Sequence, residues 1–155
     1  MRYNRRFSMS RRMARELVLH MLFTNDFVNE DSEKVLESSL GHNFDLFSDE
    51  YELYQQAPAE AQDGYIHAAF TGIMEHMPEL NNYIEQYSVG WSVSRMSRLT
   101  RCILRLCMYE MLYMDIPVGA SINEGVELAK KYDSDEAAAF INGVLGAFVA
   151  KELAR

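Results

Sequence analysis

The sequence predicts an all-α fold of about seven helices, and three observations support this prediction. Apolar residues make up 48% of the 155 residues, enough for a packed interior. In several segments they recur at spacings of three and four, as on one face of a helix. No segment of useful length alternates apolar and polar residues as a half-buried strand does. At this length we expect one domain over residues 1–155, with a flexible basic arm over residues 1–10.

The first helix is expected over about residues 10–27, where apolar residues recur at helical spacing. Its first turns contain Arg11, Arg12 and Arg15. Positive charge at this end of a helix opposes the helix dipole, by about 0.3–1 kcal/mol per residue. A phosphate backbone would favour these arginines, whereas an ordinary protein surface would not.

The middle of the chain is harder to interpret. Residues 28–60 are acidic and irregular, and the aromatic and acidic segment 44–54 fits either a loop or two short helices. Helical spacing returns over about residues 60–77. Pro78 then breaks the pattern, and a shorter helix is expected to follow as far as Tyr87.

Three helices are expected in the remainder. The first covers about residues 98–114, with Tyr113 in its apolar stripe, and is ended by Pro117 and Gly119. The pattern from Ser121 to Glu124 is typical of a capping box and predicts a helix start there. Residues 133–136 place three acids around a serine, the favourable charge for the start of the last helix.

The net charge of −8 conceals a strong asymmetry. Residues 1–15 hold six arginines and no acid, whereas residues 16–94 hold fifteen acids and one base. Residues 95–155 hold eight of each. A basic arm on an acidic body indicates one anionic and one cationic partner. The alternative is that the arm is a solvated tail.

The motifs of common enzymes and metal sites are missing from the sequence. It has no Gly-rich phosphate loop and no GxSxG, CxxC or HExxH pattern. Cys102 and Cys107 lie among apolar residues and are expected to be buried free thiols. We therefore expect no enzyme, no cofactor and no metal. No apolar run is long enough to span a membrane, and the arginine-rich start is unlike a secretory signal, so we expect a cytoplasmic protein.

Four motifs between residues 99 and 148 carry a family resemblance. They are ILRLCMYEM (103–111), IP (116–117), INEGVELAK (122–130) and FINGVLG (140–146). In order and spacing they resemble the C-terminal half of the NusB family of bacterial transcription antitermination factors. The resemblance implies two packed helical subdomains with one continuous core, the first ending near Ser88.

The resemblance also implies partners. Such a protein would bind boxA-type single-stranded RNA together with the ribosomal protein NusE, and the pair would stay tethered to RNA polymerase. Some relatives resemble homodimers that hide the RNA face, so a homodimer is a further possibility. The alternative is a purely protein-binding helical module whose acidic face docks a basic partner.

The RNA site implied by the resemblance combines basic and aromatic residues, because arginine pairs with phosphate and rings stack on bases. Phe140 has an alternative place in the core, and Asn142 could read a base edge or cap a loop. Gly143 and Gly146 cost about 1 kcal/mol each within a helix, so each needs either a close helix or a close ligand as its reason. The implied RNA-binding residues are Arg5, Arg6, Arg11, Arg12, Arg15, Phe140, Asn142 and Gly143.

For the protein partner, the resemblance points to Phe23 and Arg101 as NusE contacts. Thr100 stands where relatives often carry an acid, so that contact is expected to be altered or moved. Glu136 matches an acidic position near the RNA face and would restrain binding. Finally, Arg105 and Glu110 are expected to belong to a partly buried ion-pair set with Glu124 rather than to an acid–base site.

Overall fold

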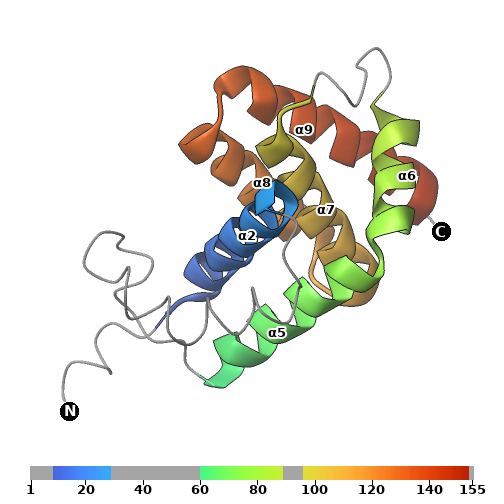
Figure 1. Ribbon diagram of the computed structural model, residues 1–155. Coiled ribbons are helices and arrows are strands. Elements are labelled where there is room, and N and C mark those ends of the chain that lie inside the picture. The colour runs from blue at the N-terminus through green and yellow to red at the C-terminus, as the bar shows by residue number, and fades with distance from the viewer. Residues whose placement is uncertain (1–8, 29–59, 89–95, 154–155) are drawn as a thin grey trace. The chain divides into compact units, whose positions relative to one another are not determined.

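The computed structural model describes residues 9–28, 60–88 and 96–153, and these ranges contain helices but no strand (Figure 1). The all-α prediction is confirmed, with six α-helices in the described ranges against about seven expected. The helices are α2 (Arg11–Val28), α5 (Glu60–Glu75), α6 (Met77–Tyr87), α7 (Arg98–Tyr113), α8 (Val118–Tyr132) and α9 (Asp135–Phe148), and a π-helical segment, η3 (Val149–Leu153), follows.

The chain divides into two compact units, residues 1–71 and residues 72–155. The division lies inside α5, so α6 belongs entirely to the second unit. The expectation that a first subdomain ends near Ser88 is therefore wrong. The physical reason is that α6 packs against α7 and α9, both of which belong to the second unit.

In the first unit, one face of α2 is fully buried, as its apolar spacing predicts. Leu17, Val18, Met21 and Leu22 are each at most 1% exposed. The α5 segment of this unit buries its own apolar face in the same way, with Phe70 fully buried. Burial of these two faces supplies the main stabilisation of the unit, since burying a large apolar side chain contributes about 1.5–3 kcal/mol.

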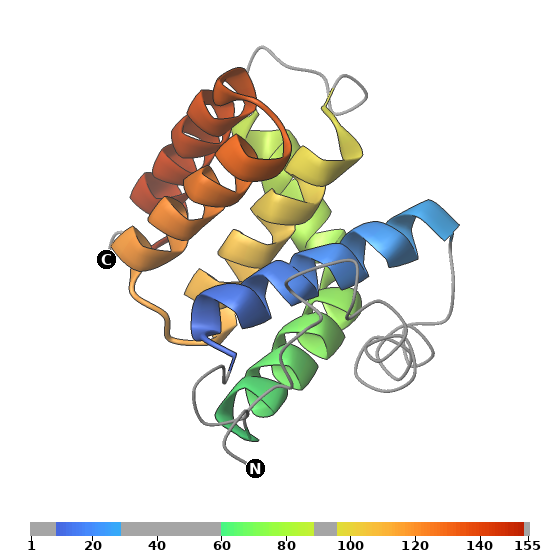
Figure 2. The same ribbon diagram turned by 90° about the vertical axis from the view of Figure 1, so that its left-hand side faces the viewer.

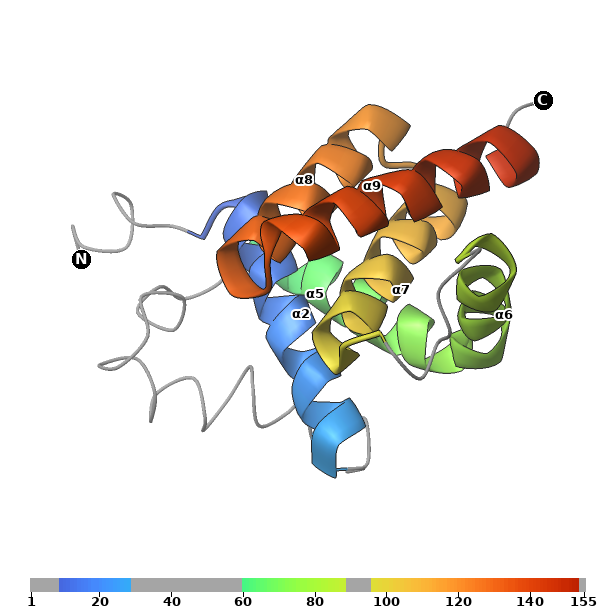
Figure 3. The same ribbon diagram turned by 90° about the horizontal axis from the view of Figure 1, so that it is seen from above.

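In the second unit, α8 and α9 form a helical hairpin, and the two helices lie side by side in Figures 2 and 3. α7 packs against both of them. The approach of α7 to α8 is close at Gly125, where an added Cβ would lie 2.5 Å from Cys107 Sγ. Both cysteines are buried and free, as predicted.

Polar bonds tie α6 to α7. Arg105 donates from Nε to Asn81 Oδ1 at 2.9 Å. About two helical turns further along α7, the Tyr113 hydroxyl lies 2.8 Å from both carboxylate oxygens of Glu79. This hydrogen bond raises the pKa of Tyr113 to about 12. Tyr113 is 46% exposed, so its expected place in the apolar stripe of this helix is wrong.

The capping box predicted at Ser121 is also wrong. Pro117 is the N-cap, and α8 begins one residue later, so Ser121 lies inside the helix. Its hydroxyl donates to Glu110 Oε1 at 2.9 Å and approaches the Cys107 carbonyl at 3.3 Å. Both Ser121 and Glu110 are fully buried, and a buried carboxylate is costly unless it is hydrogen-bonded. The serine therefore serves the interface between α7 and α8.

In the ranges that the structure describes, no helix combines the length and the apolar character needed to cross a membrane. The same ranges hold no group of three His, Cys, Asp or Glu side chains that could bind a metal ion.

Candidate nucleic-acid interface

The first candidate surface is the start of α2. Ser10 caps this helix, because its Oγ accepts a hydrogen bond from the Met13 amide at 3.2 Å. The first turn contains no acid. Arg11 and Arg12 are exposed there, so the predicted positive charge at this helix end is present on the surface.

Arg11 and Arg15 converge on one aromatic ring from α5. The Arg11 guanidinium lies 4.3 Å from the centre of the Tyr65 ring, and that of Arg15 lies 5.8 Å from it. Arg11 also donates from Nε to Gln62 Oε1 at 2.8 Å. A cation over an aromatic face is stabilised by about 0.5–1 kcal/mol when exposed and by more when desolvated. These contacts hold the guanidinium of Arg11 in a defined orientation.

The three described arginines therefore differ in role. Arg15 is only 5% exposed, so it supports the Tyr65 ring, and its direct contact with RNA stays a prediction. Arg11 and Arg12 are exposed. Arg5 and Arg6 lie outside the described residues.

Sequence reasoning did not identify Tyr65 or Gln62 as part of this surface. They lie one turn apart on α5, and 51 residues separate Gln62 from Arg11. Nothing in the local pattern of α5 indicates which arginines it meets. Only the packing of the first unit reveals that Tyr65 and Gln62 contact Arg11.

The second candidate surface is the first half of α9. Ser134 caps the helix, accepting a hydrogen bond from the Ala137 amide at 3.0 Å. Phe140 is partly buried, whereas Asn142 and Gly143 are exposed. The side chain of Phe140 is therefore accessible in part and is not sealed in the core.

The two glycines of this helix have open space around them. A Cβ added at Gly143 or at Gly146 would meet nothing within 4 Å among the described residues. Close packing of another described helix is therefore not the reason for either glycine. Close approach of a ligand, the other reason that we considered, stays a prediction.

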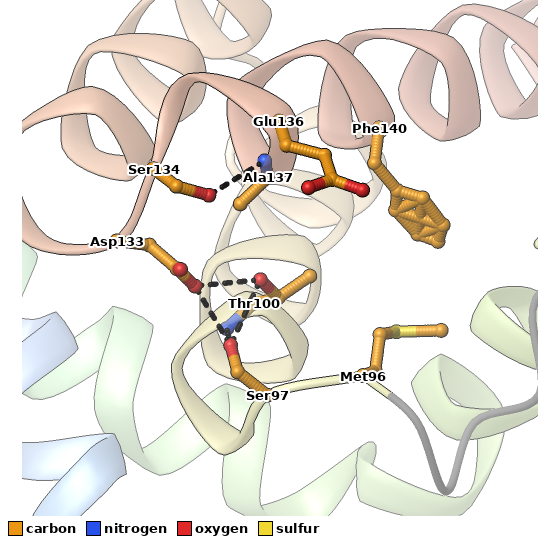
Figure 4. Close-up of a pocket in the computed structure, with 8 residues that line it drawn as sticks. All are labelled: Met96, Ser97, Thr100, Asp133, Ser134, Glu136, Ala137 and Phe140. Atoms are coloured by element: carbon orange, nitrogen blue, oxygen red, sulfur yellow. Dashed lines mark hydrogen bonds between the residues drawn. The ribbon is translucent and has the colours of Figure 1, made fainter.

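Beside Phe140 lies a pocket with a volume of about 180 Å³, between the start of α7 and the start of α9 (Figure 4). Figure 4 shows Phe140 and Met96 along one side, with Asp133, Ser97 and Thr100 at the other. Its lining residues come from three segments: Met96, Ser97, Thr100, Asp133, Ser134, Glu136, Ala137 and Phe140.

A hydroxyl–carboxylate network forms the polar wall of this pocket. Ser97 Oγ donates to Asp133 Oδ2 at 2.7 Å, and Thr100 Oγ1 donates to the same oxygen at 3.0 Å. Ser97 Oγ also accepts the Thr100 amide at 3.0 Å and so caps α7. Thr100 therefore helps to hold Asp133 in place.

The pocket is acidic, unlike the start of α2. Asp133 and Glu136 are its charged lining residues, and none of the lining side chains is basic. Such a wall repels phosphate and attracts hydrogen-bond donors. Sequence reasoning singled out Phe140 and Glu136 but missed Asp133, because Ser97 lies 36 residues away from it. The sequence offers one sign of this contact, which is that Ser97 stands directly before the helix that begins at residue 98.

The predicted contacts with a protein partner lie in different units of the chain. Phe23 is on α2 and is 38% exposed. Arg101 is on α7 and is partly exposed. Its Nε atom is buried and has no hydrogen-bond partner among the described residues. Buried donors are normally paired. The roles of Phe23 and Arg101 in partner binding stay predictions.

Comparison with known proteins gives a consistent result. The profile of the NusB family matches residues 12–150. A transcription antitermination protein NusB from Thermoanaerobacter sp. (strain X514) is 42% identical over 144 residues, which cover 93% of each chain.

Solved structures with the same fold agree. A T. maritima NusB structure superposes with a TM-score of 0.77 at 28% identity and covers 93% of each chain. A crystal structure of the antitermination factors NusB and NusE in complex with dsRNA matches with a TM-score of 0.75. At 22% identity, covering 90% of this chain and 96% of that one, the second match shows the fold alone.

Proposed function

This chain belongs to the NusB family, and we propose that it acts in transcription antitermination by holding boxA-type single-stranded RNA together with the ribosomal protein NusE. Its role is that of a transcription antitermination protein and not of an enzyme. In this proposal the protein and NusE stay tethered to RNA polymerase in the cytoplasm, where the nascent ribosomal transcript is made. One structure with this fold contains NusB and NusE in complex with dsRNA, and we take NusE and RNA as the partner classes for this chain.

The observation that carries the proposal is the open face of α9. Gly143 has nothing within 4 Å of an added Cβ among the described residues, and the partly exposed Phe140 ring lies one turn before it. A helix that keeps a glycine without a packing reason is destabilised by about 1 kcal/mol. An RNA strand that approaches the backbone at Gly143 and places a base on Phe140 supplies the missing reason.

The start of α2 supplies the complementary chemistry. The guanidinium of Arg11 is oriented by Gln62 and Tyr65, which lowers the entropy lost when it binds phosphate. Arg12 adds a second exposed cation. We propose that these arginines, with Arg5, Arg6 and Arg15, bind the phosphate backbone, while α9 binds the bases through Phe140, Asn142 and Gly143.

For the protein partner, we propose that NusE covers Phe23 and pairs with Arg101. An exposed phenylalanine is a suitable anchor for an interface, and the buried Nε of Arg101 lacks a partner among the described residues. Arg101 as a whole is partly exposed, so a carboxylate of NusE would pair with the accessible part of its side chain.

The exposed face of α9 is also suited to a second copy of the chain. A homodimer formed there would compete with RNA for Phe140 and Gly143. Light scattering with and without boxA RNA tests this arrangement, because RNA should then convert dimers into monomeric complexes.

The direct test of the proposal is binding to labelled boxA RNA in a salt series, with and without NusE. We expect binding to single strands to weaken with salt by a log–log slope of about −0.7 per phosphate contact. We also expect a duplex of the same sequence to bind less well, because a base must be unstacked to reach Phe140. Absence of binding with NusE present, or equal affinity for a scrambled strand, would refute the proposal.

A further inference from the structure

The pocket beside Phe140 has features that general RNA binding does not explain. Its volume is about 180 Å³. Drug-sized ligands occupy larger pockets, of about 300–1,000 Å³. A single planar ring is therefore the kind of ligand that it can hold, and the Phe140 side chain offers that ring a stacking surface (Figure 4).

The polar wall of the pocket is built to accept hydrogen bonds. Ser97 and Thr100 both direct their hydroxyl protons to Asp133 Oδ2, so within the described residues the side-chain bonds of Asp133 all go to that oxygen. A carboxylate can accept about four hydrogen bonds in total. Asp133 therefore keeps accepting capacity, chiefly at Oδ1, while the two hydroxyls fix its orientation.

The charge of the pocket decides which part of an RNA strand can enter it. Phosphate is repelled by Asp133 and Glu136, so only a base can occupy the pocket. Cytosine, adenine and guanine each carry an exocyclic amino group that donates hydrogen bonds, whereas uracil presents carbonyl oxygens on either side of its single N–H. The carboxylates would repel those carbonyl oxygens, because both groups are hydrogen-bond acceptors.

We propose that this pocket selects a nucleobase that carries an exocyclic amino group, which stacks on Phe140 and donates a hydrogen bond to Asp133. The inference rests on the proposed RNA-binding function and assigns Asp133 the role of a specificity-determining residue. Ser97 and Thr100 act through it as positioning residues.

The test removes the amino group from the RNA and the charge from the protein, separately and together. In boxA-type RNA, each amino-bearing base is replaced in turn by its analogue without that group: purine riboside for adenosine, inosine for guanosine, and 2-pyrimidinone riboside for cytidine. Affinities are measured by fluorescence anisotropy at one salt concentration. The affinity of the wild-type protein should fall about tenfold when the analogue replaces the base at one position of the RNA. That loss corresponds to one hydrogen bond to a charged group.

For the Asp133→Asn variant, the same base replacement should lower the RNA affinity by only about threefold or less, because the amide oxygen of Asn accepts a weaker hydrogen bond than a carboxylate does. Its side-chain oxygen still accepts from Ser97 and Thr100, so the fold should survive, and thermal unfolding checks this. Asp133→Glu is the second variant, since it keeps the charge but moves the carboxylate by one methylene. Asp135→Asn is the matched control, because it removes the same charge two residues away and does not line the pocket.

The outcomes separate this inference from the function on which it rests. If RNA binds but no position couples to Asp133, or if D133N and D135N change the affinities equally, the inference is wrong and the RNA-binding proposal survives. If the wild-type protein binds no boxA RNA, both are wrong. If an arginine-rich peptide binds instead, and D133N abolishes that binding, the pocket docks protein and the inference is overturned.

Discussion

The start of α2 and the pocket beside Phe140 offer opposite chemistry to a ligand. At the start of α2, the guanidinium of the exposed Arg11 is held by a tyrosine ring and an amide. In the pocket, carboxylates and hydroxyls stand beside a phenylalanine, without a basic side chain in the lining. A nucleic-acid strand has the same two aspects, since its phosphates are anionic and its bases are planar hydrogen-bonding rings.

The comparison shows that net charge is a poor guide to this kind of site. The chain as a whole carries −8, and its pocket is acidic, yet both features are compatible with binding a polyanion when cations elsewhere hold the phosphates. Salt dependence distinguishes the two surfaces, because only phosphate contacts release counterions.

The largest effect is expected from the double substitution Arg11→Ala and Arg12→Ala. Two lost phosphate contacts should reduce the log–log salt slope by about 1.4 in magnitude and weaken RNA binding by at least tenfold at moderate salt. Anisotropy titrations in a salt series measure both quantities. The control is Lys151→Ala, which removes an exposed cation from η3. An unchanged slope in the double variant would show that the start of α2 is not a phosphate-binding surface.

The next largest effect is expected from Phe140→Leu. This substitution keeps an apolar side chain but removes the ring face, and base stacking on an aromatic ring contributes about 1–3 kcal/mol. RNA affinity should fall accordingly while the salt slope stays as in the wild type. A changed slope, or an unchanged affinity, would contradict the division of labour between the two surfaces.

Two smaller effects of opposite sign are expected from Gly143→Ala, a gain in stability and a loss of RNA affinity. An added Cβ meets nothing within 4 Å in the described part of the chain, so the helix should gain about 0.5–1 kcal/mol in unfolding free energy. RNA affinity should fall several-fold, because the methyl group occupies the space of the strand. Thermal unfolding and RNA titration measure the two effects. Gly119→Ala is the control, because an added Cβ there also meets nothing within 4 Å among the described residues and the glycine lies on α8, outside the proposed RNA surface, so RNA affinity should stay unchanged.

The smallest effect is expected from Glu136→Gln. Removing one negative charge from the pocket rim should strengthen RNA binding about two- to threefold, as expected for an exposed charge at moderate salt. The gain should be the same for all RNA sequences and should disappear at high salt, where such charges are screened. Weaker binding would mean that Glu136 makes a contact that the strand requires.

The sequence by itself determined the helices and the family. Apolar spacing placed α2 and α7 within one or two residues of their observed bounds, and the acids at residues 133–136 marked the start of α9, because those signals are local. The ordered motifs between residues 103 and 146 identified the family for the same reason. The pattern at Ser121 misled, because Pro117 starts α8 earlier and a buried Glu110 needs the serine hydroxyl.

Only the tertiary structure decided what the site residues do. Arg15 and Arg11 are four residues apart on one helix, yet packing against Tyr65 buries the first and leaves the second exposed. Asp133 becomes a pocket residue because two hydroxyls at the start of α7 bind it across a separation of more than thirty residues. Contacts between distant segments depend on how helices pack, and a local pattern of residues does not encode that packing.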